Sequence, residues 1–206
     1  MIPGPAYRIE TARISLRCLE PRHLTLVARA VEESLAHLRP WMAWARHEPA
    51  SEEHRLERLR TNRGHFDLGS DFTYGLFDRE GTTLFGIAAL KLGQIVDERE
   101  LGYWLHPAHT RQGLMHEAGL ALLRVGFELE PLDGIDLRVD PDNVRSAQVA
   151  VRLGFEGPVI DPLSAPGVDG DKRDTHVYSL SRVAYAGGPA PHAPIEAYDV
   201  LERRIF

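Results

Sequence analysis

Hydrophobic and polar residues alternate along several short stretches of the chain, and a period of two predicts β-strands. The pattern is clear from Ile14 to Leu19, as in a half-buried strand. Another pair of strands is joined by Asp78-Arg-Glu-Gly81, whose residues favour a hairpin turn. The predicted strands are 14–19, 72–77, 83–92, 98–105, 134–139, 155–160 and 175–180.

Apolar residues three and four positions apart predict helices between these strands. Pro21 is suited to the first turn of one helix, and Gly154 to the end of another. Ser51 caps a third helix that is so polar that we expect it on the surface. The predicted helices are 21–38, 51–68, 112–128 and 143–153.

The order of these elements predicts the fold class. Antiparallel hairpins come first, and a single strand–helix–strand crossover lies in the middle of the chain, which argues against a doubly wound parallel sheet. We therefore expect an α+β fold with a mixed, mostly antiparallel sheet of about seven strands and helices on both faces.

Stretches without periodicity flank the predicted domain, which spans 13–183. Two loops are expected inside it, an aromatic one at 40–45 and one rich in Pro, Gly and Asp at 159–174. The remaining segments are an irregular leader at 1–12, an extended linker at 184–194 and an amphipathic tail at 195–206. The apolar residues of the tail suggest docking on the domain or on a second subunit.

Composition excludes several classes of protein. With 206 residues, 43% hydrophobic and 26% charged, the chain is typical of one globular domain. Its single cysteine, Cys18, cannot close an internal disulfide, and a net charge of −6 does not suit a general nucleic-acid binder. We find no membrane-length apolar run, no signal peptide and no metal-ligand spacing. We therefore expect a cytoplasmic protein that needs no membrane, nucleic acid or metal.

Candidate chemistry is concentrated in residues 101–118, a strand, a short turn with Arg111 and Gly113, and the start of a helix. The N-terminus of a helix exposes unpaired N–H groups, and a glycine there lets a phosphate approach the backbone. An ordinary strand-to-helix turn would carry the same residues. The glycine patterns of P-loops and of dinucleotide-binding folds are both absent.

A second motif follows in Asn143-Val-Arg-Ser146 and Leu153-Gly-Phe155. Together with Thr110–Met115, it makes residues 100–155 resemble the acyl-CoA core of the GNAT N-acetyltransferases, most closely the RimJ/RimL-type branch that acetylates ribosomal-protein N-termini. The family's phosphate loop has the form R/Q-x-x-G-x-G/A, from which Thr110 and Met115 depart. The resemblance extends over about residues 12–181.

This resemblance implies the GNAT fold, with acetyl-CoA bound where the strands at 98–105 and 135–139 splay apart. Asn143 would hydrogen-bond the pantetheine or the thioester side, and the backbone of Trp104, Leu105 and His106 would pair with the pantetheine like an added strand. The pyrophosphate would rest on the N–H groups of Arg111, Gln112, Gly113, Leu114 and Met115.

The implied reaction moves an acetyl group from acetyl-CoA to a primary amine, foremost a protein N-terminal α-amine, by direct attack in a ternary complex. A base must first deprotonate the ammonium. Glu100 is the first candidate, because alternation places it on one strand face with Gly102 and Trp104 and because burial would raise its pKa. A surface role for Glu100 stays open, as do a water molecule or the acids Glu98, Asp161, Asp169 and Asp171 as the base.

The leaving thiolate would benefit from a proton donor. Many relatives carry a tyrosine on the last helix, but Ala150 occupies that position here, so Ser146 is the candidate donor. Trp41 and Trp44 either wall the acceptor pocket or pack in the core.

Other functions remain open at this point. The acceptor could be a small amine such as an amino sugar or a polyamine, and the departures at Met115 and Ala150 allow another acyl group. A non-enzymatic alternative is a regulatory domain that binds acyl-CoA without catalysing its transfer. The resemblance to this family also suggests a homodimer.

Overall fold

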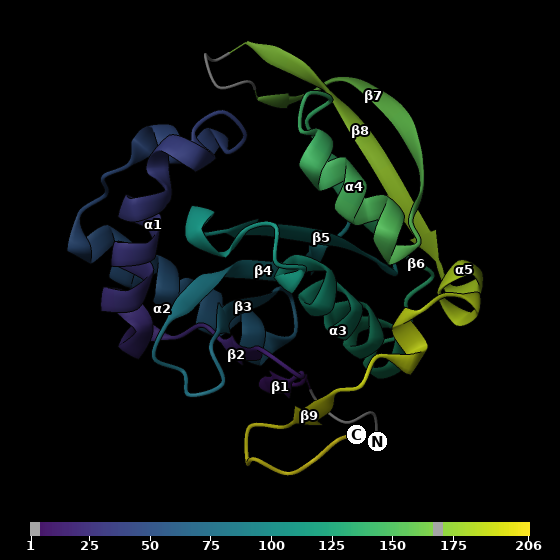
Figure 1. Cartoon of the computed structure of the whole chain (residues 1–206), viewed down its shortest axis with the longest axis horizontal. Coiled ribbons are helices and arrows are strands. Elements are labelled where there is room, and N and C mark those ends of the chain that lie inside the picture. The colour runs from purple at the N-terminus through teal and green to yellow at the C-terminus, as the bar shows by residue number, and fades with distance from the viewer. Residues whose placement is uncertain (1–4, 167–170) are drawn as a thin grey trace.

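The computed structural model describes residues 5–166 and 171–206 as one sheet with helices on both faces (Figure 1). Nine strands are described, in the order β7-β8-β6-β5-β4-β3-β2-β1-β9. Their bounds are β1 Arg8–Glu10, β2 Ser15–Cys18, β3 Phe72–Phe77, β4 Leu84–Leu92, β5 Glu98–Leu105, β6 Gly134–Val139, β7 Glu156–Pro166, β8 Lys172–Ser181 and β9 Glu196–Tyr198. The sheet is antiparallel except between β5 and β6, so the predicted mixed α+β class is confirmed.

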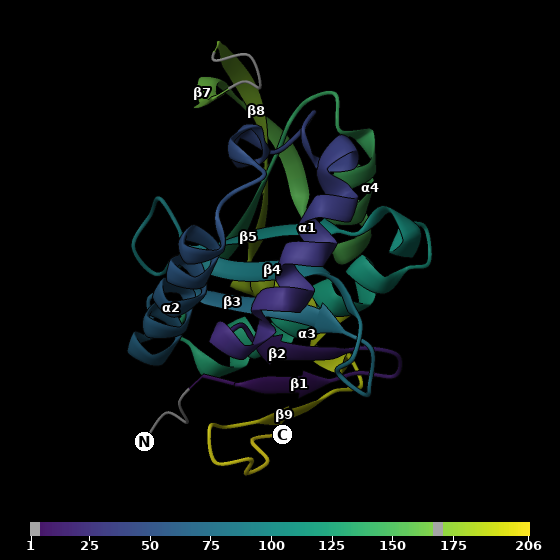
Figure 2. The same ribbon diagram turned by 90° about the vertical axis from the view of Figure 1, so that its left-hand side faces the viewer.

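Two helices cover each face of this sheet (Figures 1 and 2). On one face, α1 and α2 pack over a cluster that includes Leu59 and Trp104. On the other face, α3 and α4 cover the larger cluster around Leu122 and Leu137. The helices are α1 Leu24–Leu38, α2 Glu52–Leu68, α3 Leu114–Leu129, α4 Val144–Leu153 and the short α5 Arg182–Gly187.

The parallel strands β5 and β6 diverge after three paired positions. They pair only at Glu98↔Gly134, Arg99↔Ile135 and Glu100↔Asp136. Beyond that point β5 stays bonded to β4, and β6 stays bonded to β8, up to the end of each strand. A gap therefore opens in the middle of the sheet while its outer parts remain intact.

Arg99 anchors β5 at the point where the gap begins. This residue is buried, at 4% exposure, and its side chain pairs with Glu130 just after α3 through contacts of 2.5 and 3.1 Å. The same guanidinium donates to the carbonyl oxygens of Gly69, at 3.0 Å, and Ser70, just beyond the end of α2. One side chain thus ties β5 to a helix on each face of the sheet.

The two ends of the chain are more ordered than expected. The segment predicted as an irregular leader contains β1, which pairs with β2 and with β9 from the C-terminal tail. Each of the two strands β1 and β9 has three residues, too few to show a period in the sequence. The tail docks on the domain, as one alternative predicted, and these two strands raise the described number from the expected seven.

The two later loops also differ from expectation. Apart from Asp171, the residues described within 159–174 belong to β7 and β8, which form a long two-stranded arm (Figure 1). Most of β7 is exposed, so no buried face imposed an alternation on its sequence. The predicted linker at 184–194 contains most of α5, whose first turn is capped by Ser181 accepting from the Ala184 N–H at 3.1 Å, and a 3₁₀ turn at Ala190–His192. The helix expected from 112 begins at Leu114.

Replacing Arg99 by Met should lower the free energy of unfolding by about 2 kcal/mol, because the half-buried Glu130 would lose its partner and two carbonyl groups would lose their donor. Chemical denaturation measures this change. Arg60→Met is the matched control, since Arg60 is exposed and makes only a long 3.9 Å contact with Glu57. An equal effect of the two substitutions would contradict the anchoring role.

Candidate active site

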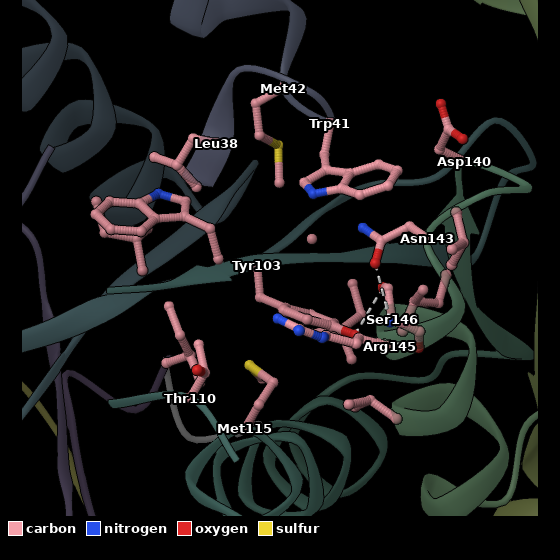
Figure 3. Close-up of a pocket in the computed structure, with 18 of the residues that line it drawn as sticks. Leu38, Trp41, Met42, Tyr103, Thr110, Met115, Asp140, Asn143, Arg145 and Ser146 are labelled. Carbon is pink, nitrogen blue, oxygen red and sulfur yellow. Dashed lines mark hydrogen bonds between the residues drawn. The ribbon is translucent and has the colours of Figure 1, made fainter. Parts of the chain in front are cut away.

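A cavity of about 1140 Å³ occupies the gap between β5 and β6. It is lined from the α1–α2 side by residues such as Trp41 and Asn62, and from the α3–α4 side by residues such as Met115 and Ser146. It therefore passes through the sheet and reaches both helix layers (Figure 3). Its volume lies just above the usual range for ligand pockets, about 300–1,000 Å³, which suits a long ligand together with a second reactant.

The turn between β5 and α3 forms one wall of the cavity. Arg111 and Gly113 both adopt left-handed backbone conformations, with φ of 62° and 77°, and α3 begins at the next residue. Within the described residues, no backbone carbonyl accepts from the N–H groups of Leu114, Met115 or His116. Unpaired amides at the start of a 16-residue helix attract an anion.

The start of α4 forms the wall on the other side of the gap. Asn143 caps this helix, its side-chain oxygen accepting from the Ser146 N–H at 3.2 Å. The amide nitrogen of Asn143 faces the cavity (Figure 3). Ala150, where many relatives would carry a tyrosine, is fully buried and contributes no polar group.

Sequence reasoning missed Tyr103, which reaches across the gap from β5 to α4 (Figure 3). Its hydroxyl lies 2.8 Å from the Ser146 hydroxyl. Burial raises the pKa of Tyr103 to about 12. Strand alternation already places Tyr103 on the face opposite Trp104, but which helix meets that face depends on the tertiary fold.

The α1–α2 side of the cavity is lined by aromatic residues and by polar residues of α2. Trp41 and Trp44 both line it, and the ring of Trp44 lies 6.5 Å from that of Trp104. Arg58 and Asn62, one turn apart on α2, also line the cavity. The sequence predicted only a surface helix here, because nothing local shows which polar residues of α2 face the sheet.

Glu100 lies at the last position where β5 pairs with β6, and it lines the cavity. Burial raises the pKa of its carboxyl, while Lys91 on the adjacent strand and Arg138 oppose the shift. No hydrogen bond to the Glu100 carboxylate is formed within the part of the chain that the structure describes. This carboxylate therefore holds a proton more readily than a surface glutamate does.

Some predicted site residues lie away from the cavity. His106 is not in its lining; its N–H donates to the Phe85 carbonyl at 2.8 Å and its ring contacts Glu33 at 3.2 Å. Gln112 is likewise absent from the lining, and its side chain donates to the Ala108 carbonyl. The other predicted cofactor residues all line it, namely Trp104, Leu105, Arg111, Gly113, Leu114, Met115, Asn143 and Ser146.

The alternative acids are placed less favourably than Glu100. Glu98 precedes the gap and does not line the cavity, although burial raises its pKa as well. Asp161 is paired with Arg138, which lowers the pKa of that carboxyl. Asp171 does not line the cavity, and Asp169 lies outside the described residues.

In the described ranges, no three His, Cys, Asp or Glu side chains are grouped to hold a metal ion. None of the helices described there has the length and apolar character needed to cross a membrane.

The family model described as "Acetyltransferase (GNAT) domain" matches residues 13–156. The chain belongs to this family. It is 28% identical to the [ribosomal protein uS5]-alanine N-acetyltransferase of Escherichia coli (strain K12) over 196 residues, which cover 89% of this chain and 95% of the relative. The GNAT resemblance seen in the sequence is thus confirmed, and the chain is a GNAT acetyltransferase. Its likeness to this relative agrees with the closer resemblance to the RimJ/RimL-type branch.

Solved structures share its fold. Mycobacterium smegmatis RimJ in complex with CoA-disulfide superimposes with a TM-score of 0.79 at 20% identity, covering 94% of this chain and 95% of that one. The microcin C7 self-immunity acetyltransferase MccE, in complex with acetyl-CoA and AMP, gives a TM-score of 0.75 at 15% identity, covering 83% and 93%. Both likenesses extend over most of each chain, so the whole GNAT architecture is shared.

Proposed function

We propose that this protein transfers an acetyl group from acetyl-CoA to a protein N-terminal α-amine, by direct attack in a ternary complex. The observation that carries this proposal is the early end of the β5–β6 pairing at Glu100↔Asp136, with a cavity there that reaches both helix layers. A thioester carrier can enter from the α3–α4 side while the amine enters from the α1–α2 side. The CoA complexes of the similar structures support this placement.

The chain offers complementary groups to each part of acetyl-CoA. The amides that begin α3, with Arg111 beside them, suit the pyrophosphate. The edge of β5 that β6 leaves unpaired, including Trp104 and Leu105, can hydrogen-bond the pantetheine as an added strand. The free amide nitrogen of Asn143 reaches the same path.

Acetyl transfer begins with removal of a proton from the ammonium, because its nitrogen has no free electron pair. Glu100 takes this proton, directly or through a water. The amine then attacks the thioester carbonyl, and a backbone N–H near Leu105 stabilises the oxyanion. Holding both reactants in one cavity supplies much of the rate gain.

The choice of an α-amine follows from the strength of this base. An α-amino group has a pKa of about 7.7–8.0, against about 10.4 for lysine, so a carboxylate deprotonates it at a smaller cost. Trp41 and Trp44 line the side from which the acceptor enters and offer an apolar wall to its first residue. The uS5-alanine specificity named for the E. coli relative supports an N-terminal acceptor.

A panel of acceptors tests the function directly. We expect thiol release from acetyl-CoA with peptides bearing a free N-terminal alanine or serine, and none with the same peptides Nα-acetylated. Preference for an amino sugar or polyamine would overturn the acceptor class. Thermal stabilisation by acetyl-CoA without thiol release from any amine would indicate a non-catalytic acyl-CoA-binding domain.

Glu100→Gln should lower kcat about 100-fold and leave the Kd for acetyl-CoA unchanged, because the base is lost but the cofactor groups are intact. In the wild-type protein, kcat/KM should fall as pH drops through the raised pKa of Glu100, where the protonated carboxyl can no longer accept a proton. Steady-state kinetics across pH and calorimetric titration measure both effects. Glu98→Gln is the matched control, on the same strand face but outside the cavity; an equal loss in both variants would reject Glu100 as the base.

Gly113→Val should weaken acetyl-CoA binding more than tenfold, because a β-branched residue is strained at φ 77° and would distort the turn that presents the α3 amides. The added Cβ would also lie 3.4 Å from the Arg13 guanidinium. Calorimetric titration with acetyl-CoA checks this. Gly64→Val is the control, since a Cβ at Gly64 on α2 meets nothing within 4 Å. Normal affinity of the Gly113 variant would show that the phosphates bind elsewhere.

A further inference from the structure

Tyr103 and Glu100 stand on opposite faces of the same strand, three residues apart. Glu100 shares its face with Trp104, which packs among the α1–α2 cluster. Tyr103 shares its face with Leu101, packs against the α3 cluster and ends beside α4. A thioester lying in the gap next to β5 would therefore have a carboxylate on the acceptor side and a phenol on the cofactor side.

The Tyr103 hydroxyl is held by Ser146, whose backbone carbonyl accepts from it at a long distance of 3.4 Å. It lies 2.8 Å from the Ser146 hydroxyl, and either oxygen can be the donor. Ser146 is itself fixed in the first turn of α4, where its N–H donates to the Asn143 cap. When the serine hydroxyl donates to the phenol oxygen, the phenol O–H has only the long contact with the Ser146 carbonyl as its acceptor within the described residues. It can exchange this weak contact for an acceptor in the cavity that both residues line.

We propose that the Tyr103 hydroxyl is the group that donates a hydrogen bond to the sulfur of the leaving CoA, with Ser146 as its positioning residue. This inference rests on the proposed acetyl transfer. It assigns the donor role to Tyr103 in place of Ser146. The phenol thus comes from strand β5 and not from the α4 position that the buried Ala150 occupies.

The proton balance of the reaction is consistent with this role. The ammonium gives one proton to Glu100, the N–C bond forms, and the C–S bond breaks with its electron pair going to sulfur. The nitrogen loses its second proton to water, and the sulfur takes one up from water after release. Tyr103 stays neutral throughout, since a phenol with a pKa of about 12 stabilises a thiolate, whose thiol has a pKa of about 8.5, without surrendering its proton to it.

The test measures the pKa of the CoA thiol in its complex with the protein, by titrating the ultraviolet absorbance of the thiolate. A hydrogen bond from Tyr103 stabilises the thiolate, so the pKa of the bound thiol should lie below that of free CoA. The protein's own thiol does not interfere, because Cys18 is its single cysteine and burial raises the pKa of that thiol to about 12.

Tyr103→Phe should raise the pKa of the bound thiol by about one unit and lower kcat about 10- to 100-fold, with KM for acetyl-CoA nearly unchanged. Ser146→Ala should shift both quantities in the same direction by less, and should add nothing in the Tyr103→Phe background. Tyr178→Phe is the matched control, a buried tyrosine on β8 outside the cavity, and should change neither.

Three results would overturn the inference while leaving acetyl transfer in place. They are a wild-type bound thiol with the pKa of free CoA, a Tyr103→Phe variant with wild-type kcat, and a variant that loses CoA affinity without a change in the thiol pKa. If Tyr103→Phe does not fold, the wild-type and Ser146→Ala titrations decide. Failure of the proposed function itself would show differently, as absence of thiol release by the wild-type protein.

Discussion

The structure depends on how two parallel strands are held apart. β5 and β6 share three paired positions and then diverge, which leaves backbone groups in the middle of a sheet without strand partners. Such an interruption would be costly if the strands were otherwise free. Here each strand keeps its full pairing on its other side, and the buried Arg99 fixes β5 to α2 and α3 where the gap opens.

This divergence places reactive groups without requiring any unusual local structure. Because successive side chains of a strand point to opposite faces, one strand brings Glu100 to the α1–α2 face and Tyr103 to the α3–α4 face. The loop that follows the same strand leads into the unpaired amides of α3. Three parts of the proposed chemistry are thus carried by about sixteen consecutive residues, from Glu100 to Met115.

The periphery of the fold closes the sheet around this centre. At one end, β1 is covered by β9 from the C-terminal tail, so the N-terminal strand is not left as an edge. At the other end, β7 and β8 continue as an arm, where Arg138 on β6 pairs with Asp161 on β7 and Arg173 on β8 pairs with Asp140 after β6. These ion pairs join the arm to the strand that borders the cavity.

The sequence by itself determined the central elements and the family. Strand alternation and helical spacing were sufficient for the mixed sheet, and the Asn143 and Gly113 motifs for the family resemblance, because each depends on residues close together in the chain. The phosphate-binding role of the turn at Gly113 and the choice of Glu100 as base stay predictions. Only the tertiary structure decided the short strands β1 and β9, the exposed arm, and the contact between Tyr103 and Ser146. The Tyr103–Ser146 contact and the pairing of β1 with β9 join residues 43 to about 190 positions apart, and a local pattern carries no information about which distant partner a side chain or an edge will meet. The arm joins nearby residues, but β7 is mostly exposed, so no buried face imposed an alternation on its sequence.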